Sequence, residues 1–98
     1  MKLDLIVPSF NEEENVVNFY NKVNEALGDI KHNFIFVDDG SKDKTLKKLK
    51  ELHKKDDECV KIVSFSKNFG KEAAIYAGLL HSKSDYACII DCDLQQNP

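Results

Sequence analysis

Residues 86–98 read YACIIDCDLQQNP, an apolar run followed by two aspartates and a polar tail. The run is typical of a buried strand, and side chains two residues apart in a strand lie on the same face of the sheet. Asp91 and Asp93 are therefore expected together at the carboxyl end of this strand. At about 6–7 Å and an effective dielectric near 20, two unpaired carboxylates repel by about 2–3 kcal/mol. The pair predicts a bound divalent cation, or protonation.

Three further apolar runs lie upstream, and each is interpreted as a strand. They are residues 3–7, which Pro8 is expected to end, residues 34–37 and residues 60–65. The fourth strand is expected to span residues 86–91. Long apolar runs of this kind are typical of parallel strands that are covered on both faces.

Amphipathic periodicity predicts a helix after each of the first three strands. The first helix is expected to have Asn11 as its N-cap, with acidic residues in its first turn, and to end near Gly28. The second is expected over residues 43–54, and the third begins near Phe69 or Gly70. The inward stripe of the third helix is expected to hold Ala73, Ala74, Ala77 and Leu80.

Strands that alternate with helices predict an α/β fold. We expect a Rossmann-like, three-layer α/β/α arrangement with a parallel sheet, right-handed crossovers and strand order 3-2-1-4. A chain of 98 residues forms one domain at most. In such sheets ligands bind at the carboxyl ends of the strands where the order reverses. This rule points to residues 8–12, 38–41 and 91–95.

Composition excludes several classes of protein. The net charge of −3 argues against a nucleic-acid binder, which normally carries a basic patch. The three cysteines form no CxxC pair and suggest neither a disulfide framework nor a thiolate zinc site. No apolar run approaches the roughly 18–20 residues of a membrane span, and no leader precedes the first strand, so we expect a reducing, cytoplasmic location.

The loops at the expected crevice carry the candidate ligand-binding residues. After the first strand the chain reads PSFNEEE, without the glycine-rich turn of a dinucleotide site. Phe10 offers a ring face and Glu12 an acceptor for a base or ribose. Of Asp38 and Asp39, at most one should face the crevice while the other holds the turn. Lys71 could reach an anion, although alone it is more simply a surface lysine.

The spacing of Asp91 and Asp93 is the stronger signal. A hard divalent cation that also takes phosphate oxygens usually receives one or two protein carboxylates. Gln95 continues the spacing and offers a further oxygen. A solvated turn at a strand end is the alternative.

Four stretches taken in order resemble the successive motifs of family 2 glycosyltransferases. They are VPSFNEEEN (7–15), VDDGSKDKT (37–45), SKNFGKEAA (66–74) and DCDLQ (91–95). The closest resemblance is to the bacterial branch similar to dolichol-phosphate mannosyltransferase, which transfers a sugar to a polyprenyl phosphate. The resemblance implies a GT-A fold, of which this chain is the N-terminal, nucleotide-binding half.

The resemblance also implies roles for single residues. Pro8, Phe10 and Glu12 would line the base and ribose pocket, Asp39 or Asp38 would contact the nucleoside, and Lys71 would lie near the donor. Asp91 and Asp93 match the catalytic DxD element, which holds Mg²⁺ or Mn²⁺ against the donor diphosphate, and Gln95 matches a further metal-contacting position. The tail QNP departs from the DPP that commonly follows this glutamine in the family, which removes one carboxylate.

The function implied is a metal-dependent, inverting transfer of a sugar from a UDP- or GDP-sugar to a polyprenyl phosphate or glycan in cell-envelope synthesis. Family members are longer, so this chain by itself is expected to be inactive and to leave the edge of its fourth strand open for self-association. Membrane contact is expected only through a C-terminal part, at the cytoplasmic side of the inner membrane. The alternatives are a non-catalytic nucleotide-binding module and a receiver-type signalling domain.

Overall fold

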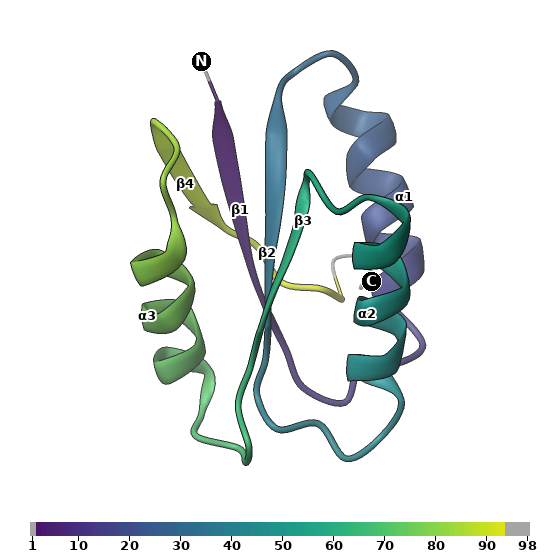
Figure 1. Cartoon of the computed structure of the whole chain (residues 1–98), viewed down its shortest axis with the longest axis vertical. Coiled ribbons are helices and arrows are strands. Elements are labelled where there is room, and N and C mark those ends of the chain that lie inside the picture. Colours follow the sequence, from purple (N-terminus) through teal and green to yellow (C-terminus); the bar gives the residue numbers. More distant parts are fainter. Residues whose placement is uncertain (1, 94–98) are drawn as a thin grey trace.

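The computed structural model describes residues 2–93, in which strands and helices alternate. The elements are β1 Leu3–Ser9, α1 Val16–Leu27, β2 His32–Asp38, α2 Thr45–Lys55, β3 Val60–Ser64, α3 Lys71–His81 and β4 Tyr86–Ile89. All strand pairings are parallel and the order is β3-β2-β1-β4. Helix α3 lies on one face of the sheet, and α1 and α2 lie on the other (Figure 1). The predicted three-layer α/β/α fold and strand order are confirmed.

Alternating side chains of the central strands pack into two hydrophobic cores, one on each face of the sheet. Leu5 and Val7 of β1 pack toward α1 and α2, whereas Ile6 between them packs toward Ala74 of α3. Phe19 of α1 meets the rings of two β2 phenylalanines edge-on, with ring centroids 6.2 Å apart in each case. The central strands are therefore covered on both faces, as their nearly continuous apolar sequences predicted.

Pro8 lies inside β1, so the prediction that it ends the strand was wrong. The carbonyl of Ile6 accepts a hydrogen bond from Ile90 N, on the side of β4. Backbone groups two residues apart in a strand point to the same side, so the nitrogen of Pro8 also faces that side. The ladder between β1 and β4 ends at Ile6 and Ile89, so no hydrogen bond of the sheet is lost at Pro8.

Asn11 is not the N-cap of α1, which begins at Val16 after Asn15. Asn11 has a positive φ of 54° and connects two loops instead. Its backbone N–H donates to Ser41 Oγ at 2.9 Å, and its side-chain oxygen accepts from Lys42 N at 2.9 Å. The polar side chain that suited a helix cap is used in a tertiary contact.

Helix α3 turns only part of the expected stripe inward, because Ala74 is buried and Ala77 packs against the same core but Leu80 does not. Ala74 and Gly78 are its buried residues, whereas Leu80 is 66% exposed. A Cβ added at Gly78 would lie 2.4 Å from Cγ2 of Ile6, so the missing side chain lets α3 approach β1. The inward position of Leu80 was a wrong prediction, because Leu80 lies about 200° around the helix from Gly78.

Strand β4 is shorter than predicted, since it ends at Ile89 rather than at residue 91. Asp91 and Asp93 therefore belong to the turn that follows the strand. Both aspartates are exposed, and Cys92 between them is buried. The other elements differ from their predicted bounds by a few residues.

Candidate functional site

A pocket of about 220 Å³ lies at the carboxyl edge of the sheet, between the ends of β1 and β4. This is the place where the strand order reverses, as the sequence predicted. The walls come from the end of β1, the loop after it, the end of β2, the start of α3 and the turn after β4. The lining residues are Pro8, Ser9, Phe10, Glu12, Asp39, Lys71, Asp91, Cys92 and Asp93.

The loop after β1 is held in place by the loop that precedes α2. The N–H of Glu12 donates to Thr45 Oγ1 at 2.7 Å, and Thr45 is fully buried. The N–H of Glu13 donates to Asp43 Oδ2 at 3.3 Å. These bonds position Phe10, which is 41% exposed, and Glu12 at the mouth of the pocket.

Asp39 joins the end of β2 to the start of α3. Its carboxylate accepts from Phe69 N at 2.8 Å, from Gly70 N at 3.0 Å and from the side-chain amide of Asn68 at 2.9 Å. Gly40 allows the two loops to touch, because a Cβ there would lie 2.2 Å from the backbone carbon of Lys67. Asp39 therefore lines the pocket and also fixes the position of the first turn of α3.

Asp38 does not line the pocket. Its side chain is buried, and its Oδ1 has no hydrogen-bond partner among the described residues. Burial raises the pKa of Asp38, and hydrogen bonds from the hydroxyl and backbone of Ser41 only partly offset this. Only one aspartate of the pair lines the crevice: Asp39 is at the pocket, whereas Asp38 is the last residue of β2 and is buried.

Lys71, the first residue of α3, reaches across the pocket to the turn after β4. Its Nζ lies 2.7 Å from Oδ1 of Asp91, and the two side chains are 58% and 56% exposed. The hydrogen bond and charge of Asp91 raise the pKa of Lys71, so the ammonium is the stable form. A cation thus already lies beside one carboxylate of the DxD element.

Cys92 forms the buried floor between the two aspartates. Burial, with the negative charge of Glu12 nearby, raises the pKa of the Cys92 thiol to about 12, so it stays a neutral thiol. Neither Ser9 nor Cys92 was singled out from the sequence as a pocket residue. The sequence signal for Cys92 was its residue type, because a free cysteine is among the most often buried residues.

The described residues offer oxygen ligands of the kind that a divalent cation prefers, but only two carboxylates of this kind face the pocket from the turn after β4. Asp91 and Asp93 supply hard oxygen donors on one side of the pocket, and the ammonium of Lys71 shows that a cation is accommodated there. Within residues 2–93 no group of three or more His, Cys, Asp and Glu side chains is arranged to hold a metal ion. Gln95, the third predicted ligand, lies outside the described residues.

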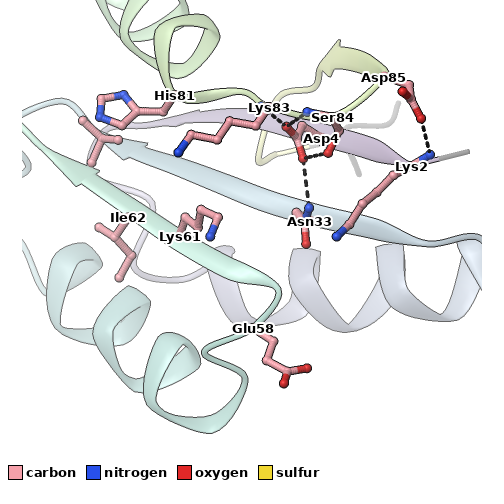
Figure 2. Close-up of a pocket in the computed structure, with 11 residues that line it drawn as sticks. Lys2, Asp4, Asn33, Glu58, Lys61, Ile62, His81, Lys83, Ser84 and Asp85 are labelled. Carbon is pink, nitrogen blue, oxygen red and sulfur yellow. Dashed lines mark hydrogen bonds between the residues drawn. The ribbon is translucent and has the colours of Figure 1, made fainter.

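A larger pocket of about 560 Å³ opens at the opposite, amino edge of the sheet (Figure 2). Its most deeply buried polar side chain is Asp4, whose carboxylate accepts from Asn33 Nδ2, Ser82 Oγ, Lys83 N and both the N–H and hydroxyl of Ser84. The carboxylate is occupied in joining β1 to the segment between α3 and β4. We therefore assign the site to the smaller pocket, where the strand order reverses and the candidate residues meet.

Solved structures support the fold. The chain superposes on residues 1–349 of TarS from S. aureus in complex with UDP with a TM-score of 0.80 and 25% identity, over 95% of this chain and 28% of that 1–349 chain. Within residues 2–93 no helix is long and apolar enough to cross a membrane.

Sequence relatives agree with the structural match. A bactoprenol glucosyl transferase of Shigella phage SfV is 44% identical over 97 residues, which are 97% of this chain and 31% of the relative. An uncharacterized glycosyltransferase of Synechocystis sp. is 39% identical over 100 residues, again 31% of the relative. The chain thus spans about a third of the length of these curated relatives. The family model for glycosyl transferase family 2 matches residues 4–98. The chain belongs to glycosyl transferase family 2.

Proposed function

We propose that this chain forms the donor-binding part of a glycosyltransferase that moves a sugar from a nucleoside diphosphate to a polyprenyl phosphate. The observation that carries the proposal is the convergence of Phe10, Glu12, Asp39, Lys71 and the DxD aspartates on one pocket at the strand-order reversal. Family membership and the bactoprenol glucosyl transferase relative support it. The complex of TarS with UDP supports a nucleoside diphosphate as the ligand.

One side of the pocket suits the nucleoside of such a ligand, and the other side suits its diphosphate. Phe10 offers its exposed ring to a base, and Glu12 has a carboxylate oxygen that already accepts a 2.7 Å hydrogen bond from Asn15. Lys71 and the exposed aspartates lie on the α3 and β4 side, where the diphosphate would lie. The nucleoside would therefore occupy the β1 side, and the charged groups would lie at the sugar side.

Asp91 and Asp93 would hold Mg²⁺ or Mn²⁺, together with Gln95. The bound ion would neutralise the negative charge that develops on the departing nucleoside diphosphate. Asp91 and Asp93 would orient the diphosphate in this way, and the ammonium of Lys71 would add a second positive charge beside it.

The transfer itself is proposed as a single displacement. A phosphate oxygen of the acceptor bonds to the anomeric carbon while the bond from that carbon to the diphosphate oxygen breaks, and the electron pair leaves with the nucleoside diphosphate. The configuration of the anomeric carbon is then inverted. A phosphate acceptor is already a nucleophile, so this step needs little help from a general base.

The acceptor and the location belong to the longer protein. A polyprenyl phosphate is a membrane lipid, so the enzyme must meet a membrane, and we propose that it does so at the cytoplasmic side through a part outside the described residues. Fractionation of cells that express the full-length protein, followed by detection in membrane and soluble fractions, tests the location. Recovery of the full-length protein only in the soluble fraction would contradict it.

Calorimetric titration of this chain with UDP and GDP, with and without Mn²⁺, tests the donor site. We expect metal-dependent binding of at least one nucleotide, and a loss of about tenfold or more in affinity for Asp93→Asn, because a carboxylate that holds the metal becomes a neutral amide. Asp57→Asn, which removes a charge from an exposed turn before β3, is the matched control and should bind like the wild type.

Two outcomes would overturn the donor site. One is the absence of metal-dependent binding of either nucleotide to the folded chain. The other is unchanged affinity in Asp93→Asn. Binding without sugar transfer by the full-length protein would instead favour a non-catalytic nucleotide-binding module.

A further inference from the structure

We propose that Lys71 is a built-in counter-cation of the DxD element, which competes with a divalent ion for Asp91 and moves to the diphosphate when a nucleotide binds. The proposal rests on the proposed function and adds a residue that controls the affinity of the site for metal. It begins from the 2.7 Å contact between Lys71 Nζ and Asp91 Oδ1.

Hydrogen bonds fix the backbone just before Lys71, whereas its side chain is exposed to solvent. Asp39 holds the N–H groups of Phe69 and Gly70 at 2.8 and 3.0 Å, which sets where α3 begins. The side chain of Lys71 then crosses open space, since it is 58% exposed. Four flexible methylene groups allow its ammonium to exchange partners without any movement of the helix.

The contact with Asp91 is easily broken. Ion pairs between two exposed side chains contribute little to stability, because water screens them and both side chains lose conformational freedom. In the absence of a better partner, the ammonium still offsets the repulsion between Asp91 and Asp93, which line the same pocket. A divalent ion carries twice the charge of the ammonium and would bind the same oxygen of Asp91.

The released ammonium has one obvious new partner. Lys71 and Asp91 line the same 220 Å³ pocket, so an anion bound there would lie within reach of the side chain. An ammonium group has three donors and no acceptor, which suits phosphate oxygens. Lys71 would therefore weaken the binding of metal alone and strengthen the binding of metal together with a nucleoside diphosphate.

These two opposite effects give the test. Mn²⁺ binding to this chain is measured by the paramagnetic resonance signal of free Mn²⁺, and UDP binding by calorimetry at saturating Mn²⁺. For Lys71→Met we expect about threefold to fivefold tighter binding of Mn²⁺ alone, because an exposed ion pair no longer competes. We expect about tenfold weaker binding of UDP, because a charged hydrogen bond to the diphosphate is lost.

Two further variants distinguish the specific contacts of the Lys71 ammonium from a general effect of positive charge near the pocket. Lys67→Met removes the same charge from the loop before α3, where Lys67 lies 5.3 Å from the centroid of the Phe69 ring and does not line the pocket. It should change both affinities much less than Lys71→Met. Lys71→Arg keeps a positive charge and should recover most of the UDP affinity.

The outcomes distinguish this inference from the proposed function. If the wild type binds UDP with Mn²⁺ but Lys71→Met binds Mn²⁺ alone no more tightly than the wild type, the role of Lys71 is wrong and the donor site stands. If the folded wild type binds neither Mn²⁺ nor UDP, the donor site and the role of Lys71 both fail. Far-UV circular dichroism of each variant checks that the fold is retained.

Discussion

At the scale of single residues, the buried carboxylate of Asp4 is a feature that the sequence did not predict. In the sequence it is only a polar interruption of an apolar strand. In the structure it is 3% exposed and accepts hydrogen bonds from Asn33 and from Ser82, Lys83 and Ser84. Burial alone would raise the pKa of Asp4, but the hydrogen bonds from Ser84, Asn33 and Ser82 outweigh it and hold the pKa well below its usual range.

Replacing Asp4 with asparagine should lower the free energy of unfolding by about 2–3 kcal/mol at pH 7, because one acceptor becomes a donor that faces other donors. A group with a depressed folded-state pKa contributes stability above its unfolded pKa of about 4 and loses it as the pH falls toward the folded value. The difference between wild type and Asp4→Asn should therefore shrink below pH 4. Urea unfolding at pH 7 and pH 3 measures both effects.

Asp85→Asn is the control for this experiment. Asp85 is exposed and lies in the same pocket wall, where Lys2 N donates to it at 3.4 Å (Figure 2). The same charge is removed without a buried hydrogen-bond network, so stability should change by less than about 0.5 kcal/mol. Equal effects of the two substitutions would show that Asp4 acts only through its charge.

At the scale of an element, the position of α3 depends on a residue without a side chain. Gly78 lies so close to Ile6 that a Cβ added to Gly78 would be 2.4 Å from Cγ2 of Ile6. Alanines in this helix predicted a close approach to the sheet, and Ala74 is indeed fully buried. The approach matters for the site, because Lys71 at the start of the same helix lines the pocket.

Gly78→Ala should destabilise the protein by about 1–3 kcal/mol through overpacking against Ile6, despite the gain of roughly 1 kcal/mol in helix propensity. Thermal unfolding measures the change. Leucine has no Cγ2 branch on its Cβ, so the double variant Gly78→Ala with Ile6→Leu should recover part of the loss. A higher melting temperature for the single variant would argue that α3 is not in tight contact with β1.

At the scale of the whole molecule, β4 forms an edge of the sheet with exposed apolar side chains. Tyr86 and Ile89 of β4 are 58% and 46% exposed, and Leu79 and Leu80 of α3 add further exposed apolar surface. Strand β4 pairs with β1 on one side, and no strand among residues 2–93 pairs with its other side. An apolar edge of this kind is a template for pairing with another chain.

We propose that this chain self-associates through the edge of β4, as the sequence led us to expect. Sedimentation velocity should show a larger species that grows with concentration, and Ile89→Lys should reduce it, because a charge at an edge opposes strand pairing. Val17→Lys, at a position on α1 that is 41% exposed, is the control and should leave the association unchanged. A single monomeric species at all concentrations would contradict the proposal.

The sequence by itself determined the order of the elements, the parallel sheet and the edge at which the pocket lies. Local periodicity defines strands and helices, and the handedness of parallel crossovers leaves few ways to arrange them. It also selected most of the pocket residues, because the ends of neighbouring parallel strands must meet. Its errors at Pro8, Asn11 and Leu80 concern single residues whose surroundings come from distant parts of the chain.

Only the tertiary structure decided which polar side chains meet. The hydrogen bonds that Phe69 N donates to Asp39 and Ser84 Oγ donates to Asp4 join residues 30 and 80 positions apart. The same holds for Lys71 and Asp91, whose contact requires α3 and the turn after β4 to be placed by the whole sheet. Hydrogen bonds and ion pairs act over a few ångströms, so local patterns cannot predict them before the strands are in register.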